Sequence, residues 1–104
     1  MAQFDVHRNA GKHKDTIPYV VVVQSSPFDD YRRRVVVPLV KATMLGKISH
    51  GRFNPAFRIR STAVILHPPE MVSIPIEQLG AVVASLSGEG QQIMAALDEL
   101  LSRA

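Results

Sequence analysis

The sequence contains no cysteine and no tryptophan. Without cysteine the protein cannot form disulfide bridges, thiolate metal sites or a cysteine nucleophile. Four Phe and two Tyr make up all the aromatic residues. Any catalytic or metal-binding role would therefore rest on histidine, acidic, hydroxyl or basic side chains.

Long apolar runs are also missing, as is a leader in which basic residues precede an apolar stretch. These absences predict neither a membrane span nor a secretory signal, and so a soluble, cytoplasmic protein. The 104 residues, 11.4 kDa, leave room for one folded unit, and we expect a single domain over residues 1–104. With 46% hydrophobic residues, the chain can build one modest core.

Acidic residues are scarce in the first part of the chain. Residues 1–60 carry eleven Lys or Arg against four Asp or Glu, whereas residues 61–104 carry one Arg against five acids. The net charge of +3 is thus the sum of +7 in residues 1–60 and −4 in residues 61–104. Such asymmetry indicates either an anionic partner or a solvated basic face. No nucleic-acid motif accompanies the charge, so we expect no direct sequence-specific contact with nucleic acid.

Short segments rich in β-branched residues predict strands. The run of four valines, residues 20–23, is typical of a central strand that is buried on both faces. Pro38 interrupts another valine-rich run and predicts a bend where the sheet curls. Residues 41–49 fit a helical turn or a wide connection equally well. The predicted strands cover residues 3–8, 17–23, 33–40, 54–60, 62–67 and 72–76.

The apolar spacing changes to a helical period near the C-terminus. Leu79, Val82, Val83 and Leu86 fit a short helix, and residues 91–102 fit a longer one with one apolar stripe. Gly88 and Gly90 separate the two helices, and Ser87 is the expected N-cap of the second. We expect a mainly β fold, a curled antiparallel SH3-like barrel, with a C-terminal α-helix.

Searches for catalytic and metal-binding patterns give little. The four histidines, His7, His13, His50 and His67, lie in different segments without metal-ligand spacing, which predicts no metal site. No phosphate-binding loop precedes a helix, so no cofactor is expected. Arg32, Arg33 and Arg34 could clamp phosphates, but a ribonuclease would also need an acid–base partner, for which His13, His50 or a polar Ser or Thr are the candidates. The alternative is that these arginines are solvated or pair with Asp29 and Asp30.

Several segments in order resemble the CcdB family of toxins. The resemblance covers nearly the whole chain and rests on hydrophobic motifs whose joint order and spacing are more specific than each motif alone. The matching segments are Phe4, Val21 to Ser25, Arg33-Arg34, Val35-Val36-Val37-Pro38-Leu39, Met71 to Ile76, Leu86-Ser87 and the terminal helix.

This resemblance implies a curled SH3-like barrel that forms a homodimer and is neutralised by a CcdA-like antitoxin. It further implies a toxin that is not an enzyme: it poisons the A subunit of DNA gyrase, a type II topoisomerase, by trapping the cleaved enzyme–DNA complex. Such a toxin would favour one conformation of gyrase over the others through differential affinity. The antitoxin arm is acidic, disordered when free and folds on binding, and we expect it to contact Arg32, Arg33 and Arg34.

The chain departs from the family at the residues that poison gyrase. The family's C-terminal Trp-Gly-Ile tail falls on Ser102, Arg103 and Ala104, none of which matches. A buried interface tryptophan is a strong anchor that serine cannot replace. The remaining expected gyrase contacts are Pro27 and Phe28 after the second strand, and Asp98 and Leu101 on the helix.

Three functions therefore stay open on sequence alone. The protein poisons gyrase through a reshaped tip that uses Phe28 and Arg103, or it keeps the scaffold and antitoxin binding while poisoning is lost or retargeted. The third function is that of the related MazF-type toxins, which share the barrel and cut RNA.

Overall fold

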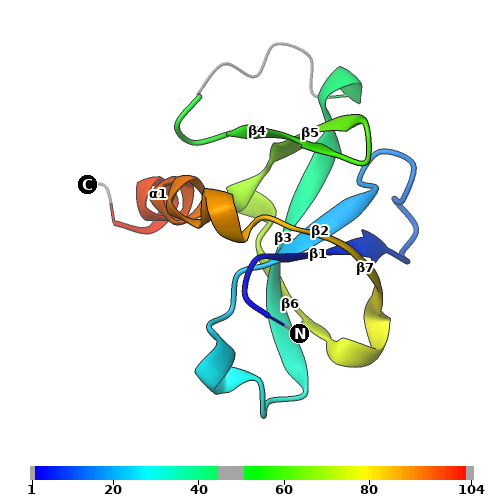
Figure 1. Ribbon diagram of the computed structural model, residues 1–104, viewed down its shortest axis with the longest axis vertical. Helices are drawn as coiled ribbons and strands as arrows, with labels where there is room; N and C mark the ends of the chain where they lie inside the picture. Colours follow the sequence, from blue (N-terminus) through cyan, green and yellow to red (C-terminus); the bar gives the residue numbers. More distant parts are fainter. Residues whose placement is uncertain (1, 45–50, 103–104) are drawn as a thin grey trace.

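The computed structural model describes residues 2–44 and 51–102. Within these ranges a seven-stranded antiparallel sheet is followed by one α-helix (Figure 1). The elements are β1 (Asp5–Asn9), β2 (Tyr19–Val22), β3 (Arg33–Lys41), β4 (Ala56–Ile59), β5 (Thr62–Leu66), β6 (Val72–Pro75), β7 (Leu79–Ser85) and α1 (Gly90–Leu101). This confirms the predicted mainly β fold with a C-terminal helix.

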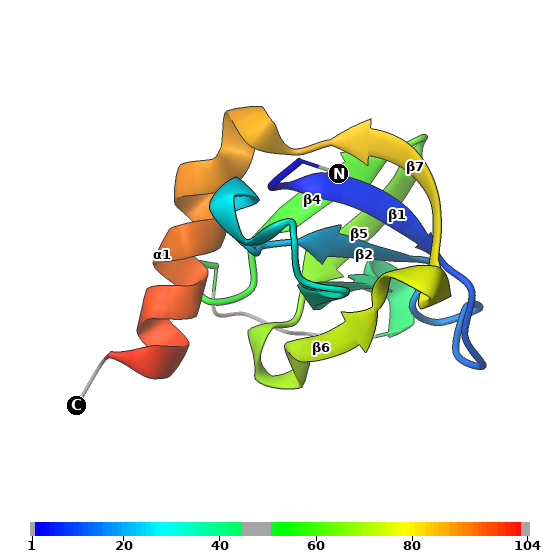
Figure 2. The same ribbon diagram turned by 90° about the horizontal axis from the view of Figure 1, so that it is seen from below.

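The sheet is organised around β3, its longest strand. The strand order is β4-β5-β3-β2-β1-β7, and β6 also pairs with β3. One edge of β3 pairs with β2, while the other edge pairs with β6 over its first half and with β5 over its second. The strands curl around one another rather than lying flat (Figures 1 and 2), which confirms the predicted curled, barrel-like sheet.

Pro38 lies where β3 changes partner. Residues Arg33–Val36 pair with β6, and Leu39–Lys41 pair with β5. The Pro38 carbonyl accepts a hydrogen bond from the His67 backbone N–H at 3.1 Å on this edge. In a strand, the backbone nitrogen and the carbonyl of one residue point to the same edge. The N–H group that proline lacks would therefore face the gap between β6 and β5. The proline therefore breaks no ladder bond at the predicted bend.

The valines of β2 and β3 supply both faces of the sheet. Val21, Val37 and Leu39 belong to the main core, whereas Val20 and Val36 belong to a smaller cluster on the opposite face. Successive residues of a strand point to opposite faces, so a continuous apolar run is what a strand covered on both sides requires. The prediction of a strand that is buried on both faces is confirmed for β2.

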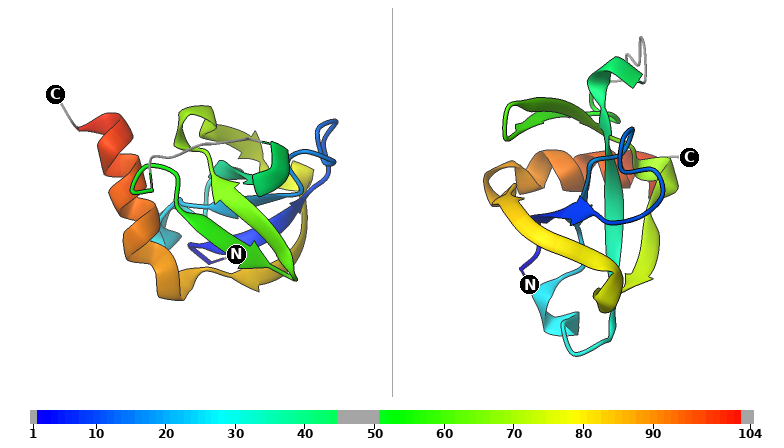
Figure 3. Two further views of the ribbon diagram at one scale, coloured as in Figure 1. Left: turned by 90° about the horizontal axis from the view of Figure 1, so that it is seen from above. Right: turned by 90° about the vertical axis from the view of Figure 1, so that its right-hand side faces the viewer.

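The helix α1 covers the main core. Its buried face, Ile93, Ala96 and Leu97, belongs to the same apolar cluster as the sheet, and α1 lies along one side of the curled sheet (Figures 2 and 3). The first turn of the helix approaches the ring of Phe4 so closely that a Cβ on Gly90 would lie 2.6 Å from it. These contacts fix the direction in which the C-terminal end of the helix projects.

The prediction of a short helix at Leu79 to Leu86 is wrong, because residues Leu79–Ser85 form β7 and pair with β1. The β1–β7 register shifts twice, as at a β-bulge. These shifts break the alternation of buried and exposed residues, so the apolar residues fall at a spacing that imitates a helix. The predicted N-cap is also wrong: Ser87 begins a 3-10 turn, and α1 begins at Gly90 with no capping side chain.

β1 and β7 approach each other closely at Gly80. A Cβ at this position would lie 2.6 Å from the Arg8 carbonyl oxygen, so only glycine fits. The Gly80 carbonyl lies 2.9 Å from Nδ1 of the buried His7, which places the imidazole proton on Nδ1. His7 is thus a core histidine that ties the first and last strands together.

Candidate functional site

The segment between β2 and β3 forms a protruding corner that carries several of the predicted site residues. It contains a short 3-10 turn, η1 (Ser26–Phe28), with Pro27 in its first turn. The Gln24 side chain holds the corner closed: its Nε2 donates to the carbonyls of Phe28 at 2.9 Å and Arg33 at 3.3 Å, and its Oε1 accepts from Val35 N–H at 3.0 Å. Pro27 and Phe28 are consequently displayed on the surface.

The guanidinium of Arg34 points into the protein. Its side chain is 5% exposed, and it donates to the backbone carbonyls of Asp29 at 2.9 Å, Arg33 at 2.9 Å and Tyr31. Its Nε lies 3.6 Å from the Asp29 carboxylate. Arg34 therefore fastens the base of the corner and presents no charge to a partner, which corrects its expected place on an antitoxin-binding surface. The proposed pairing of the arginine run with an aspartate is realised by Arg34 and Asp29.

The other two arginines are exposed. Arg32 Nη2 donates to Glu77 Oε1 at 2.7 Å, and Arg33 donates to the hydroxyl and the carbonyl of Ser73 at 2.9 and 2.7 Å. The pKa of the Glu77 carboxyl lies below its ordinary value because it accepts a hydrogen bond from its own backbone N–H and another from Arg32. Both guanidiniums stay open to solvent and can exchange these contacts for a charged partner at small cost.

Two exposed aromatic rings stand beside these arginines. Phe28 is 52% exposed and Tyr31 is 68% exposed, and their ring centroids are 6.2 Å apart with an interplanar angle of 50°. Together with Val35 and the arginines they line an open, mostly apolar hollow of about 620 Å³. Exposed aromatic and arginine side chains around a hollow are typical of an anchor site for a protein partner.

The second group of predicted residues lies at the C-terminal end of α1. Leu101 is 68% exposed, and Asp98 and Ser102 are exposed beside it. The Ser102 backbone N–H and hydroxyl both donate to the Asp98 carbonyl, at 2.9 and 2.8 Å, and close the last turn. Arg103 and Ala104, which were also predicted contacts, lie outside the described residues.

These two groups do not form one patch within a protomer. The η1 corner lies at the lower end of the molecule in Figure 1, and the C-terminal end of α1 lies at its left side. A partner that contacts both groups must span this separation or meet them on two protomers.

His13 and His67, the other histidines that the structure describes, lie in different places from each other and from the arginines. His67 Nε2 lies 3.2 Å from Glu70, His13 lines a different hollow from the arginines, and His50 lies outside the described residues. Among residues 2–44 and 51–102, no group of three or more His, Cys, Asp or Glu could hold a metal ion. None of the histidines in the described part of the chain thus lines the hollow beside the arginines, as cleavage of RNA by these groups would require.

Sequence reasoning missed two residues of the corner, Gln24 and Tyr31. Tyr31 directly precedes the arginine run. An aromatic residue next to basic residues is the sequence signal that could have identified it. Nothing in the sequence marks Gln24, because its role depends on backbone groups from the other side of the corner.

Comparison with known protein families gives one match. Residues 3–102 match the family model described as CcdB protein. A search of curated proteins finds no match to the chain.

Proposed function

The chain belongs to the CcdB family, and from this premise we propose that it poisons DNA gyrase by contacting the A subunit through the η1 corner and the C-terminal end of α1. Family membership implies a gyrase-poisoning toxin of a toxin–antitoxin module. Toxins of this family inhibit gyrase in the cytoplasm and are not enzymes. No helix within residues 2–44 and 51–102 is long and apolar enough to span a membrane.

Inhibition of this kind needs no catalytic group in the toxin. A protein that binds the cleaved state of gyrase more tightly than the other states shifts the population toward the cleaved state and delays resealing. The affinity for that state must come from a few well-buried anchors. Leu101 and Phe28 are the large, strongly exposed apolar residues at the predicted contact positions, and they take the place of the missing tryptophan in this proposal.

Two copies of the chain suit the separation of the two surfaces. A homodimer carries two helix ends and two η1 corners, so it offers a partner four anchor positions instead of two. The exposed side chain of Leu100 on α1 gives the helix further apolar surface that a second copy could cover. We propose the homodimer as the form that binds gyrase.

The gyrase proposal is tested by a cleavage assay. Purified protein, gyrase of the source organism, supercoiled plasmid and ATP are incubated and stopped with detergent and protease. We expect linear DNA that disappears when antitoxin is added. Leu101→Ala should raise the concentration needed for half-maximal cleavage about tenfold or more, because an interface anchor contributes about 2 kcal/mol.

The matched control is Val82→Ala, which truncates another exposed apolar residue, on β7 and away from both surfaces. This variant should cleave like the parent protein. Absence of linear DNA with active gyrase and an intact dimer would contradict the proposal and favour a scaffold whose poisoning is lost or retargeted.

We propose that Arg32 and Arg33, without Arg34, bind the acidic arm of a CcdA-like antitoxin. The two exposed guanidiniums lie beside the aromatic hollow, so acidic and apolar residues of one segment could bind side by side. The excess of basic residues in the first part of the chain would steer such an arm toward the protein.

Reversing these two charges should weaken antitoxin binding. We expect the double variant Arg32→Glu, Arg33→Glu to lower the association rate at low salt about tenfold and to flatten its salt dependence, measured by surface plasmon resonance. Arg58→Glu, which reverses an exposed charge on β4, should have a smaller effect. Equal association rates for the double variant and the parent protein would rule out steering by these arginines.

A further inference from the structure

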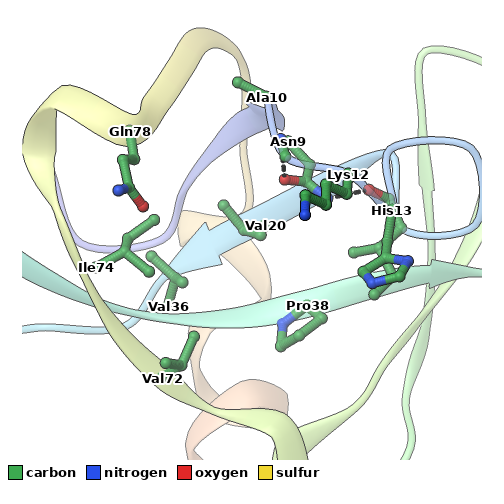
Figure 4. A pocket seen from close by; sticks show the side chains of 12 residues that line it. Asn9, Ala10, Lys12, His13, Val20, Val36, Pro38, Val72, Ile74 and Gln78 are labelled. Atoms are coloured by element: carbon green, nitrogen blue, oxygen red, sulfur yellow. Dashed lines mark hydrogen bonds between the residues drawn. The ribbon is translucent and has the colours of Figure 1, made fainter.

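A second hollow lies on the opposite face of the sheet from α1. It is a half-open groove of about 470 Å³, between the loop that follows β1 and the corner that joins β6 to β7 (Figure 4). Its volume lies in the range of pockets that bind small molecules. None of the residues predicted to contact gyrase or antitoxin lines this groove.

The floor and walls of the groove are aliphatic. Val20 and Val36 form the floor and belong to the smaller apolar cluster of the sheet, and Ile74 packs against this cluster. Val72, which is half exposed, and Pro38 add to the apolar lining. Figure 4 shows these side chains gathered in the groove. An unbranched apolar chain could bury its surface here without displacing a polar group.

The rim of the groove carries Asn9, Lys12 and His13 on one side and the neutral Gln78 on the other (Figure 4), and Lys12 supplies its positive charge. Lys12 and His13 line it, and no Asp or Glu is among its lining residues. The Asn9 side chain fixes the loop that carries them, because its Nδ2 donates to the Ile17 carbonyl at 2.8 Å and its Oδ1 accepts from Gly11 N–H at 2.9 Å. Within the described part of the chain, Lys12 makes no ion pair.

We propose that this groove binds a small amphiphilic carboxylate, a linear acyl chain with an anionic head. The tail lies on Val20, Val36 and Ile74, and the carboxylate lies at the Lys12 and His13 rim. The charge of the rim and the absence of acidic lining residues select an anionic head over a neutral or cationic one. The residues proposed here to contact gyrase and antitoxin do not line the groove, so the test of this proposal does not depend on the tests of those two.

Decanoate is the probe, added to the purified full-length protein below its micelle concentration. Methyl NMR spectra of the valines report binding, and we expect saturable shifts at Val20, Val36 and Val72. Decanol, which has the same tail and a neutral head, should bind at least threefold more weakly. Lys12→Gln should weaken decanoate binding about threefold to fivefold, as expected for one exposed charge pair.

Two further variants separate the groove from the loop as a whole. Lys14→Gln removes the same charge from the same loop at a position that does not line the groove, and it should bind decanoate like the parent protein. Val72→Glu places a carboxylate in the groove and should reduce binding tenfold or more. Shifts that do not saturate, equal binding of decanol, or equal losses in the two lysine variants would overturn the proposal.

Discussion

Arg34→Met is expected to lower the free energy of unfolding by about 2–4 kcal/mol, because it removes the buried donor to three backbone carbonyls: those of Asp29 and Tyr31 lose this donor, while that of Arg33 keeps Gln24 Nε2. Methionine has a similar length and fills the same space, so the loss reports the polar contacts rather than a cavity. Urea unfolding followed by far-UV circular dichroism measures it, since the protein has no tryptophan.

Arg33→Met is the matched control for this change. Arg33 is the preceding residue of the same strand, but its side chain is exposed and bonded only at the sheet edge. Its replacement should change the free energy of unfolding by less than about 1 kcal/mol. If both variants unfold at the same urea concentration, the buried contacts of Arg34 do not stabilise the corner.

Ile93→Ala is expected to cost about 2–5 kcal/mol, the range for truncating a fully buried aliphatic side chain. The Ile93 side chain is completely inaccessible to solvent and packs from α1 against the sheet. The total free energy of unfolding of a domain of this size is about 5–15 kcal/mol, so the variant would lose a large part of it. The loosened helix should also reduce gyrase cleavage, because α1 carries Leu101.

The neighbouring Met94 provides the control. It is 41% exposed and points away from the core, so Met94→Ala should cost less than about 1 kcal/mol. Thermal unfolding of both variants under the same conditions gives the comparison. A Met94 variant less stable than the Ile93 variant would show that the burial of the helix face is assigned wrongly.

Most of the sheet could be predicted from the sequence because runs of β-branched residues favour strands over helices. The valines of β2 and β3 are too dense for a helix surface, and Pro38 marked the place where the partner strand changes. The error at β7 has a physical cause, since the bulges in its pairing with β1 depend on a strand seventy or more residues away. No local pattern carries that information.

The candidate site was predicted less completely than the fold. Residue types identified the arginine run, but not that one member is buried. Strand alternation gives the missing signal, because Arg34 and Val36 lie on the same face of β3 and both are buried. The expected contacts on α1 and at η1 were placed on the surface, yet their separation follows from the curl of the sheet, which the sequence does not reveal.

The pairing of β1 with β7 also determines when the sheet can be completed as the chain is synthesised. β1 leaves the ribosome well before β7, its second neighbour in the sheet, because at least seventy residues of chain separate the paired positions. Until then β1 has an open edge toward β7, and the core lacks the helix that follows. A nascent chain that lacks β7 and α1 therefore cannot present the surface that the folded protein carries.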